Sequence, residues 1–351
     1  MTSAIWVMSP IILEVFIAFV FLNNTDYKEK PQIANINQVI EETPEIKDPD
    51  FVTLTFAGDI MLDRGVKNSV LKNFGGDYEK LFENLEILKE SDIFFANLEG
   101  TISDKGKDGG GIYSFHMDPD VTSALTKIGV DILSVANNHV GDWGVSAYVD
   151  SLARLKNSGI LYTGGGTNLE EAESPAIIEK YGTKIGFLGF SDKGPNWMEV
   201  GKNKAGQLLA SNPRFDEIIK TASQEVDYLV VSFHFGEEYQ AQHNSRQEYL
   251  AHKAIDNGAK IVVGHHPHVI EDTEIYSSKD CTQNSCMGYI AYSLGNFIFD
   301  QSWSKPTMQG MLLNIKLNKD GNMTERIDTF RLNKFFQPDE IMQGVEKKIE
   351  F

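Results

Sequence analysis

Residues 259–268 read AKIVVGHHPH, an apolar run that ends in three histidines within four residues. The run has the length and the valine content of a buried strand. Side chains alternate between the two faces of an extended chain, so His266 and His268 are expected to face the same side. Three histidines so close together are uncommon in a simple loop, and such a tract is typical of metal binding.

Helical and strand-like patterns alternate on both sides of this stretch. The segment SRQEYLAHKAIDNG at 245–258 is a helix pattern that ends in glycine, and GYIAYSLGNFIFD at 288–300 is a strand pattern. The elements expected in the earlier part of the chain are strands at 51–62, 92–100 and 131–139 and helices at 77–91, 118–130 and 145–157. This alternation favours an α/β fold with helices on both faces of a sheet.

Polar side chains follow the apolar runs at the points where the predicted strands end. The residues that bring carboxylate, amide or imidazole groups to these ends are Asp59, Asn97, Glu99, Asn137, Asn138, His139, His234, His265, His266 and His268. A single aspartate after a strand is most often a turn residue, but groups of this kind at five strand ends indicate one shared site. Ligands bind at the carboxyl ends of strands in α/β sheets, and oxygen and imidazole donors suit a divalent cation.

The composition narrows the possible partners. The chain has 351 residues, with 32 basic and 50 acidic side chains and a net formal charge of −18. So acidic a surface argues against nucleic acid, whose phosphates need Lys and Arg, and against a basic patch for anionic lipid. The glycine run at 164–166 lacks the pattern of a P-loop or a dinucleotide site, and the sequence has no serine nucleophile elbow.

The N-terminal region is expected to tether the chain to a membrane. The run AIWVMSPIILEVFIAFVFL at 4–22 approaches the ~20 residues that span a bilayer, although Pro10 and Glu14 are unfavourable in such a helix. An uncleaved signal anchor or transmembrane helix at 1–24 is therefore predicted, with a buried or interfacial helix as the alternative. A flexible acidic linker is expected at 25–50.

The folded domain is expected at 51–335, followed by a C-terminal tail at 336–351. With a single-pass anchor in the cell membrane, we expect this domain to be extracytoplasmic. In an exported protein Cys281 and Cys286 can form a small bridge, and two unpaired thiols in a loop fit the sequence equally well.

Seven stretches of the sequence resemble one known family, in the family's order and over about residues 51–317. They are GDIMLDR (58–64), ANLEG (96–100), ANNHVGDWG (136–144), YTGGGTNLEEAESP (162–175), VVSFHFGEEY (230–239), VVGHHPHVIE (262–271) and YSLGNFIFD (292–300). On these stretches the chain resembles the poly-γ-glutamate capsule-synthesis protein family (CapA type), a branch of the calcineurin-like metallophosphoesterases.

The resemblance implies a four-layer α/β/β/α sandwich and a site for one or two divalent ions, with Mn, Fe or Zn as candidates. By similarity, Asp59 takes the first metal position and Glu99 the bridging-carboxylate position, while His139 acts as general acid or stabilises the transition state. The ligand set implied is Asp59, Glu99, Asn138, His234, His266 and His268. Metal ions in such sites polarise a phosphoryl oxygen and activate water.

Three further residues in the matching stretches are candidates for substrate contacts. They are Arg64, Glu238 and His265. Arg64 has the planar group that holds a carboxylate or phosphate by a bidentate contact, and a surface ion pair is the equally weighted alternative.

One departure from the superfamily pattern affects the expected ion count. The superfamily has Asp-x-His where this chain has Asp59-Ile60-Met61. One metal therefore loses a ligand, and the alternatives are a mononuclear site, a ligand borrowed from His265, or a second ion that binds weakly.

Two functions are compatible with these features. The first is a divalent-metal hydrolase or transferase that acts at a phosphoryl or amide-like group in capsule polymer assembly, and the adjacent Asn138 and His139 favour it. The second is a non-catalytic, metal-containing component that binds poly-γ-glutamate or its membrane synthase complex, and the histidine missing at Met61 favours it. Because the chain is acidic, contacts with an anionic polymer are expected only locally, at the metal and Arg64.

Overall fold

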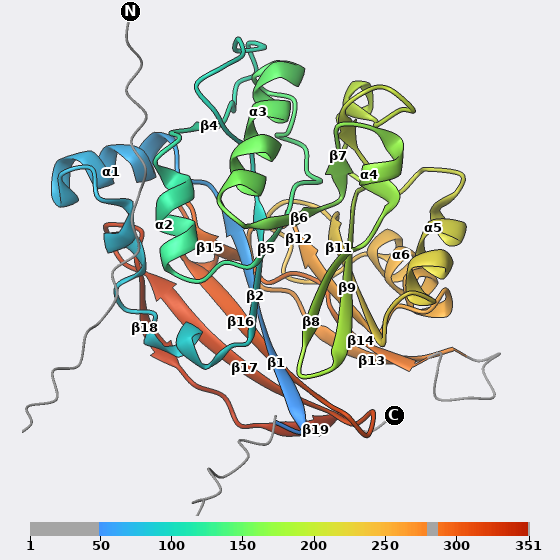
Figure 1. Ribbon diagram of the computed structural model, residues 1–351. Helices are drawn as coiled ribbons and strands as arrows, with labels where there is room; N and C mark the ends of the chain where they lie inside the picture. Colours follow the sequence, from blue (N-terminus) through green and yellow to red (C-terminus); the bar gives the residue numbers. More distant parts are fainter. Residues whose placement is uncertain (1–48, 279–286, 350–351) are drawn as a thin grey trace, which may run out of the picture. The chain divides into compact units, whose positions relative to one another are not determined.

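Two β-sheets pack against each other in the computed structural model, which describes residues 49–278 and 287–349 (Figure 1). Within these residues the larger sheet has the order β18 (Pro338–Met342), β17 (Met323–Leu332), β16 (Gln309–Asn318), β1 (Phe51–Ile60), β2 (Ile93–Leu98), β5 (Ile132–Ser134) and β6 (Leu161–Thr163), with β15 (Asn296–Ile298) beside β1 and β19 (Lys347–Ile349) beside β17. The smaller sheet has the order β13 (Thr273–Ser277), β14 (Met287–Ala291), β12 (Ile261–His265), β11 (Tyr228–His234), β9 (Thr183–Ser191) and β8 (Ala176–Lys180).

Helices and short strand pairs complete the described part of the chain. The α-helices are α1 (Arg64–Phe74), α2 (Val121–Lys127), α3 (Gly144–Asn157), α4 (Leu169–Glu173), α5 (Phe215–Ser223) and α6 (Ser245–Asp256). The short pairs are β3 (Thr101–Ile102) with β4 (His116–Met117), and β7 (Gly165–Gly166) with β10 (Gly206–Gln207). Short 3₁₀ helices are found at Tyr78–Phe82, Glu86–Glu90, Asn196–Met198 and Pro306–Met308.

The central strands of both sheets are parallel, and this places their carboxyl ends together. In the larger sheet β1, β2, β5 and β6 run in the same direction. In the smaller sheet β9, β11, β12 and β14 do the same. The loops that follow these strands gather at the upper edge of the molecule in Figure 1, which is where an α/β protein presents its ligand site.

The core between the two sheets is built from the inward-facing residues of both. Leu54 of β1 and Val230 of β11 belong to this core and are at most 1% exposed. Phe95 of β2 stacks on Phe187 of β9 across the interface, with ring centroids 5.8 Å apart. Alternation of side chains along each strand leaves the opposite face of each sheet for the helices.

Helices cover the outer faces of both sheets. Val70, Leu125 and Leu155, from α1, α2 and α3, are buried in the core on the outer face of the larger sheet. Ile219 of α5 and Ala254 of α6 are buried in the core on the outer face of the smaller sheet. The layer order is therefore α/β/β/α, with mixed sheets in the middle (Figure 1).

Two segments differ from the sequence-based expectation. The helix predicted at 77–91 consists of the 3₁₀ helices Tyr78–Phe82 and Glu86–Glu90. Gln337 Nε2 donates a hydrogen bond to the Lys80 carbonyl at 2.6 Å, and an uninterrupted α-helix would use that carbonyl internally.

The segment expected as a C-terminal tail at 336–351 contributes strands to the larger sheet. Both β18 and β19 pair antiparallel with β17. Ile349 is 2% exposed and belongs to the core between the sheets, so burial of apolar surface favours this pairing.

Other predictions lie outside the described residues. They concern the anchor at 1–24, nearly all of the linker at 25–50, and the pair Cys281 and Cys286. Among the helices of the described segments, none combines the length and the apolar character needed to cross a bilayer.

Candidate metal centre

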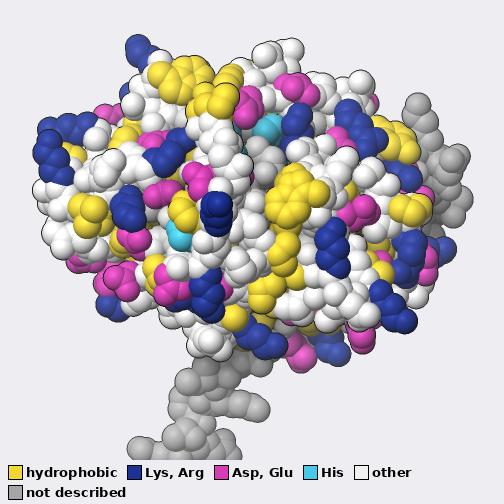
Figure 2. All heavy atoms as spheres, turned by 90° about the horizontal axis from the view of Figure 1, so that it is seen from above, with side chains coloured by type: hydrophobic (Ala, Val, Ile, Leu, Met, Phe, Trp, Pro, Cys, Tyr) yellow, Lys and Arg dark blue, Asp and Glu magenta, His cyan; other side chains and the backbone are white. Residues whose placement is uncertain are grey.

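Donor side chains from four strand ends meet at one edge of the two sheets. Asp59 lies at the end of β1, Glu99 follows β2, His234 is the last residue of β11, and His266 follows β12. Because β1 and β2 belong to the larger sheet and β11 and β12 to the smaller, the site lies across the boundary between them. Figure 2 looks onto this edge, where histidine is visible only as small patches among charged and apolar side chains.

Asp59, Glu99 and His234 form the first group of donors. One ligand atom of each lies within 4.8 Å of the others, and all three residues are buried. Asn138 adjoins this group, since its Oδ1 atom is 2.7 Å from the Nε2 atom of His234. Asn97 donates a hydrogen bond to Asp59 Oδ1 at 2.8 Å, which fixes the orientation of the carboxylate.

Glu238, His266 and His268 form the second group. Their ligand atoms also lie within 4.8 Å of one another; the histidines are buried and Glu238 is exposed. His268 connects the groups, because its Nε2 is 3.8 Å from Glu99 Oε1 and its Nδ1 is 3.3 Å from Asp59 Oδ2. Glu99 therefore lies beside both groups, where the family resemblance implies a bridging carboxylate.

Several buried donor atoms of the site have no hydrogen-bond partner within the protein. They include both carboxylate oxygens of Glu99, both ring nitrogens of His265 and the Nδ1 atom of His266. A buried carboxylate is costly unless it is paired or binds a metal. Carboxylate oxygen and imidazole nitrogen are together the ligands of Zn, Mn and Fe sites. The donor set therefore fits a divalent cation.

The two central carboxyl groups have opposite protonation tendencies. Burial raises the pKa of Glu99 well above its usual range; the charge of His268 opposes this shift, and that of Asp59 adds to it. Burial also favours the neutral form of Asp59, but contacts with His265 and His268 outweigh it and hold the pKa of Asp59 well below its usual range. Asp59 therefore ionises more readily than Glu99.

The imidazoles also differ from one another. Burial lowers the pKa of His234 well below its usual range, and burial together with the charge of His268 lowers the pKa of His266 to about 3. Burial has the same tendency at His268, but the charge of Glu99 and the contact with Asp59 outweigh it and raise its pKa to about 9. His234 and His266 are therefore neutral, the form in which imidazole binds a metal.

His139 lies at the edge of the first group, in contact with solvent. Its Nε2 atom is 3.6 Å from Glu99 Oε1, and its side chain is 12% exposed. Its Nδ1 atom is 2.7 Å from Asp142 Oδ2, and its ring lies against Phe115 with centroids 3.9 Å apart. This geometry fixes the ring and leaves Nε2 facing the donors, as proton transfer requires.

The residues considered for substrate contacts occupy three different environments. Arg64 forms a two-point ion pair with Asp300, in which its Nε atom is 3.2 Å from Oδ2, and its guanidinium lies over Phe115. His265 is 0% exposed, with Nδ1 3.5 Å from Asp59 Oδ1, so it supports the carboxylate and has no access to a substrate. Glu238 lies in the second donor group, with His266 and His268.

Three supporting residues were not predicted as part of the site. They are Asp142, Asn296, which contacts His268 Nδ1 at 3.0 Å, and Asp300. All three occur within the matching family stretches. Their position in those stretches was the available signal, but their roles depend on contacts across the fold.

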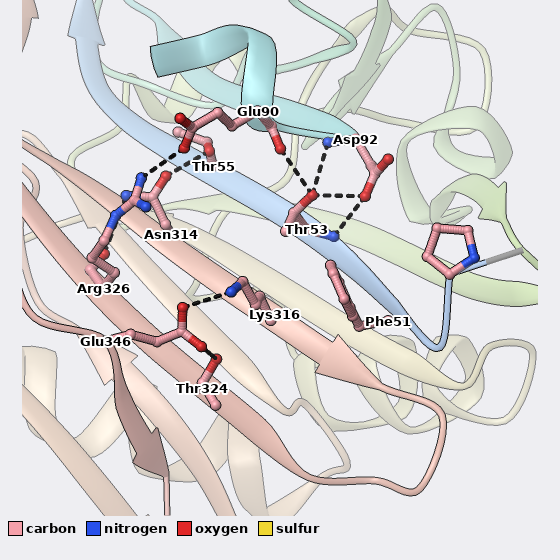
Figure 3. A pocket seen from close by; sticks show the side chains of 11 residues that line it. Phe51, Thr53, Thr55, Glu90, Asp92, Asn314, Lys316, Thr324, Arg326 and Glu346 are labelled. Atoms are coloured by element: carbon pink, nitrogen blue, oxygen red, sulfur yellow. Dashed lines mark hydrogen bonds and ion pairs between the residues drawn. The ribbon is translucent and has the colours of Figure 1, made fainter.

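A separate hollow of about 360 Å³ lies at the other end of β1 (Figure 3). Lys316 Nζ is 2.6 Å from Glu346 Oε2, and Asp92 accepts hydrogen bonds from the amide and the hydroxyl of Thr53. These polar groups are satisfied within the protein, so we assign no ligand to this hollow.

The fold and the donor array define an α/β protein with a cluster of possible metal ligands where its two sheets meet. The chain belongs to the bacterial capsule synthesis protein PGA_cap family, whose model matches residues 53–301. It is 34% identical over 286 residues to the PGA biosynthesis protein CapA of Bacillus subtilis (strain 168), and this alignment covers 80% of the present chain and 72% of the Bacillus subtilis protein. It is 32% identical over 294 residues to the capsule biosynthesis protein CapA of Bacillus anthracis, and this alignment covers 80% of the present chain and 67% of the Bacillus anthracis protein. The resemblance seen in the sequence is thereby confirmed.

Solved structures with a similar arrangement are more distant. The calcineurin-like phosphoesterase YfkN from Bacillus subtilis matches with 14% identity and a TM-score of 0.43, covering 78% of this chain and 87% of that one. A phosphatase from Mycoplasma pneumoniae matches with 12% identity and a TM-score of 0.44, covering 85% and 94%.

Proposed function

We propose that this chain is a membrane-anchored, extracytoplasmic protein of poly-γ-glutamate capsule biosynthesis whose divalent-metal centre hydrolyses a phosphoryl ester. Membership of the capsule synthesis family supports the biological setting. The observation that carries the chemistry is Glu99, a buried carboxyl group whose two oxygens have no hydrogen-bond partner in the protein, in the same cluster as Asp59 and the neutral imidazole of His234.

The residues that would hold the metal are those at the strand ends. They are Asp59, Glu99, Asn138, His234, His266 and His268. A divalent ion bound there supplies Lewis acidity toward a phosphoryl oxygen and lowers the pKa of water. Burial of the ligands keeps the site in a medium of low dielectric constant, where such electrostatic effects are strong.

His139 is the proton-transfer group in this proposal. Its Nε2 atom faces the donor array, so it can protonate the leaving oxygen of a phosphoester. Asp142 Oδ2 accepts a hydrogen bond from the Nδ1–H group and stabilises the imidazolium form that this step requires. Asp142 is a positioning residue, because it acts only through His139.

The proposed location follows from the apolar run at 4–22 and the acidic linker that follows it. A domain tethered in this way would work next to the membrane, where a polymer synthase complex and an anionic polymer or phosphoryl substrate are the expected partners. Protease protection of the full chain in intact cells, compared with lysed cells, tests this orientation.

The catalytic proposal is tested by comparing the full-length chain with His139→Ala. With Mn²⁺ added, we expect the unchanged chain to hydrolyse a generic phosphodiester and the variant to lose about 10²- to 10⁴-fold in rate. Elemental analysis should find equal metal content in both. Equal rates in the two proteins would remove His139 from the mechanism.

A non-catalytic function is favoured by one specific observation. Met61, at the position where the superfamily has a metal-binding histidine, is 0% exposed, and its sulfur accepts a hydrogen bond from the Asp63 amide at 3.3 Å. In this second candidate function the metal stabilises a domain that binds the polymer or its synthase. Retained metal and polymer binding, with no hydrolysis under any divalent ion, would select it.

A further inference from the structure

We propose that Glu238 is a metal ligand and completes, with His266 and His268, a second ion position that compensates for the histidine missing at residue 61. This inference rests on the proposed metal centre, and it adds a ligand and an ion count to it. Glu238 lies on the loop after β11, far in sequence from Met61, so the compensation comes from the fold and not from a neighbouring residue.

The first support is the convergence of donors. A carboxylate oxygen of Glu238 and a ring nitrogen of each histidine lie within 4.8 Å of one another. His266 is 4% exposed and His268 is 3% exposed, and the Nδ1 atom of His266 has no hydrogen-bond partner. Buried polar atoms almost always have a partner, so this unpaired nitrogen indicates a ligand that the protein itself does not provide.

The loop that carries Glu238 is held against the histidines. The amide of Tyr239 donates to the Pro267 carbonyl at 2.8 Å, which joins the Glu238 loop directly to the segment between His266 and His268. Tyr239, His266 and His268 have φ angles of 66°, 98° and 58°, a region that residues other than glycine rarely adopt. Surrounding structure must therefore maintain both segments, as it does at many functional sites.

Two further contacts hold the start of this loop. Gly236 has φ +88°, and a Cβ atom added there would lie 2.6 Å from Gln247 Nε2, so the close approach to α6 requires glycine. Lys193 Nζ donates to the Gly236 carbonyl at 2.8 Å. These contacts fix the path of the backbone just before Glu238, and a ligand that is held in place before binding loses less entropy on binding.

Charge and position agree with this role. A carboxyl group is deprotonated when it binds a metal. Bound in that form, Asp59, Glu99 and Glu238 together carry more negative charge than one divalent ion neutralises, whereas two ions leave a positive excess that an anionic phosphoryl group can offset. Glu99 is 3.8 Å from His268 and belongs to the first donor group, so it lies where a carboxylate is shared between two ions. Glu238 is exposed, so the second ion would be nearer to solvent and would exchange first.

The experiment compares metal binding by the full-length chain, Glu238→Gln and Glu237→Gln. Glu237 is the matched control, because it is the adjacent exposed glutamate and pairs with Lys193 at 3.1 Å. Titration calorimetry with Mn²⁺ and elemental analysis give the ion count, and electron paramagnetic resonance separates a coupled Mn²⁺ pair from an isolated ion. We expect two ions and a coupled signal in the unchanged chain and in Glu237→Gln. We expect one retained ion, at least about tenfold weaker binding of the second, and an uncoupled signal in Glu238→Gln.

Each other outcome has a definite meaning. Two ions bound equally well by Glu238→Gln would overturn the inference while the metal centre stands. One ion in all three proteins would do the same. Loss of all metal from Glu238→Gln with an unchanged melting temperature would also overturn it. Glu238 would then be needed for binding of both ions and not only of the second. If the unchanged chain binds no divalent ion, the proposed function itself fails.

Discussion

The Nδ1 atom of His139 lies 2.7 Å from the Oδ2 atom of Asp142, three residues further along the chain. The same oxygen accepts a hydrogen bond from the Phe115 amide at 3.0 Å, so the carboxylate also holds the loop against which the imidazole packs. The pair thus couples the orientation of His139 to the wall of the site. A carboxylate in this position selects the tautomer and stabilises the charged form of the ring.

Asp142→Asn should lower kcat for phosphodiester hydrolysis by about 10- to 100-fold with little change in KM, because the amide no longer stabilises the imidazolium. Steady-state kinetics and elemental analysis measure the effect, and metal content should not change. Asp108→Asn is the control. Asp108 lies in the loop between β3 and β4, where the Gly109 amide donates to the Asp142 carbonyl, and its side chain accepts a hydrogen bond from the Gly110 amide. A variant that loses metal in proportion to activity would show that Asp142 supports the ligands and not the proton transfer.

Glu99→Gln should have opposite effects on the metal-free and metal-loaded protein. Without metal, the neutral amide replaces a buried carboxyl group whose oxygens have no hydrogen-bond partner, so the variant should be at least as stable as the unchanged chain. With divalent ion at 100 times its Kd, the unchanged chain should gain about 2.7 kcal/mol in free energy of unfolding and the variant much less. Thermal unfolding with chelator and with Mn²⁺ measures both. A clearly destabilised metal-free variant would contradict this account.

Glu271 should make the stability of the fold depend on pH. Its side chain is 3% exposed, Oε2 accepts a hydrogen bond from Gln247 at 2.6 Å, and burial raises its pKa from 4.5 to about 7. Between these values the folded chain binds more protons than the unfolded chain, so the free energy of unfolding falls as pH rises from about 4.5 to about 7.

Glu271→Gln should remove this loss of stability. Across that window the free energy of unfolding of the variant should rise by on the order of 3 kcal/mol relative to that of the unchanged chain. Denaturant unfolding at pH 4.5, 6 and 7.5 measures the difference. Glu248→Gln, an exposed change on α6, is the control and should give a curve parallel to that of the unchanged chain. A constant offset between Glu271→Gln and the unchanged chain would show that Glu271 does not titrate in this range.

The central strands and the gathering of the main donor side chains could be predicted from the sequence because both depend on local pattern. Asp59, Glu99, His234 and His266 each follow an apolar run, and parallel strands bring their carboxyl ends to one edge. Their convergence within a few ångströms is therefore a consequence of strand direction. Asn97 follows the same rule, but its contact with Asp59 depends on strand register, which a single strand pattern does not specify.

The remaining features depend on contacts between residues that are distant in sequence. Arg64 and Asp300 are 236 positions apart, and neither has a local pattern that indicates the other. Gln337 binds the carbonyl of Lys80 and so interrupts a stretch whose apolar spacing predicts a helix. Glu238 is an exposed glutamate in a turn, where a solvated side chain is the ordinary expectation. Its position beside His266 depends on the hydrogen bond from Tyr239 to Pro267.

Asp59 and Glu99 come from one sheet, and His234 and His266 come from the other. A cation held by Asp59, Glu99 and His234 would therefore link the two sheets directly. Removal of the metal by a chelator should then also loosen the boundary between the sheets. Amide hydrogen exchange should accelerate in β12 of the smaller sheet and in β15 of the larger sheet. A chain without metal would then be easier for a protease to digest, so metal supply would affect the lifetime of this chain as well as its proposed activity.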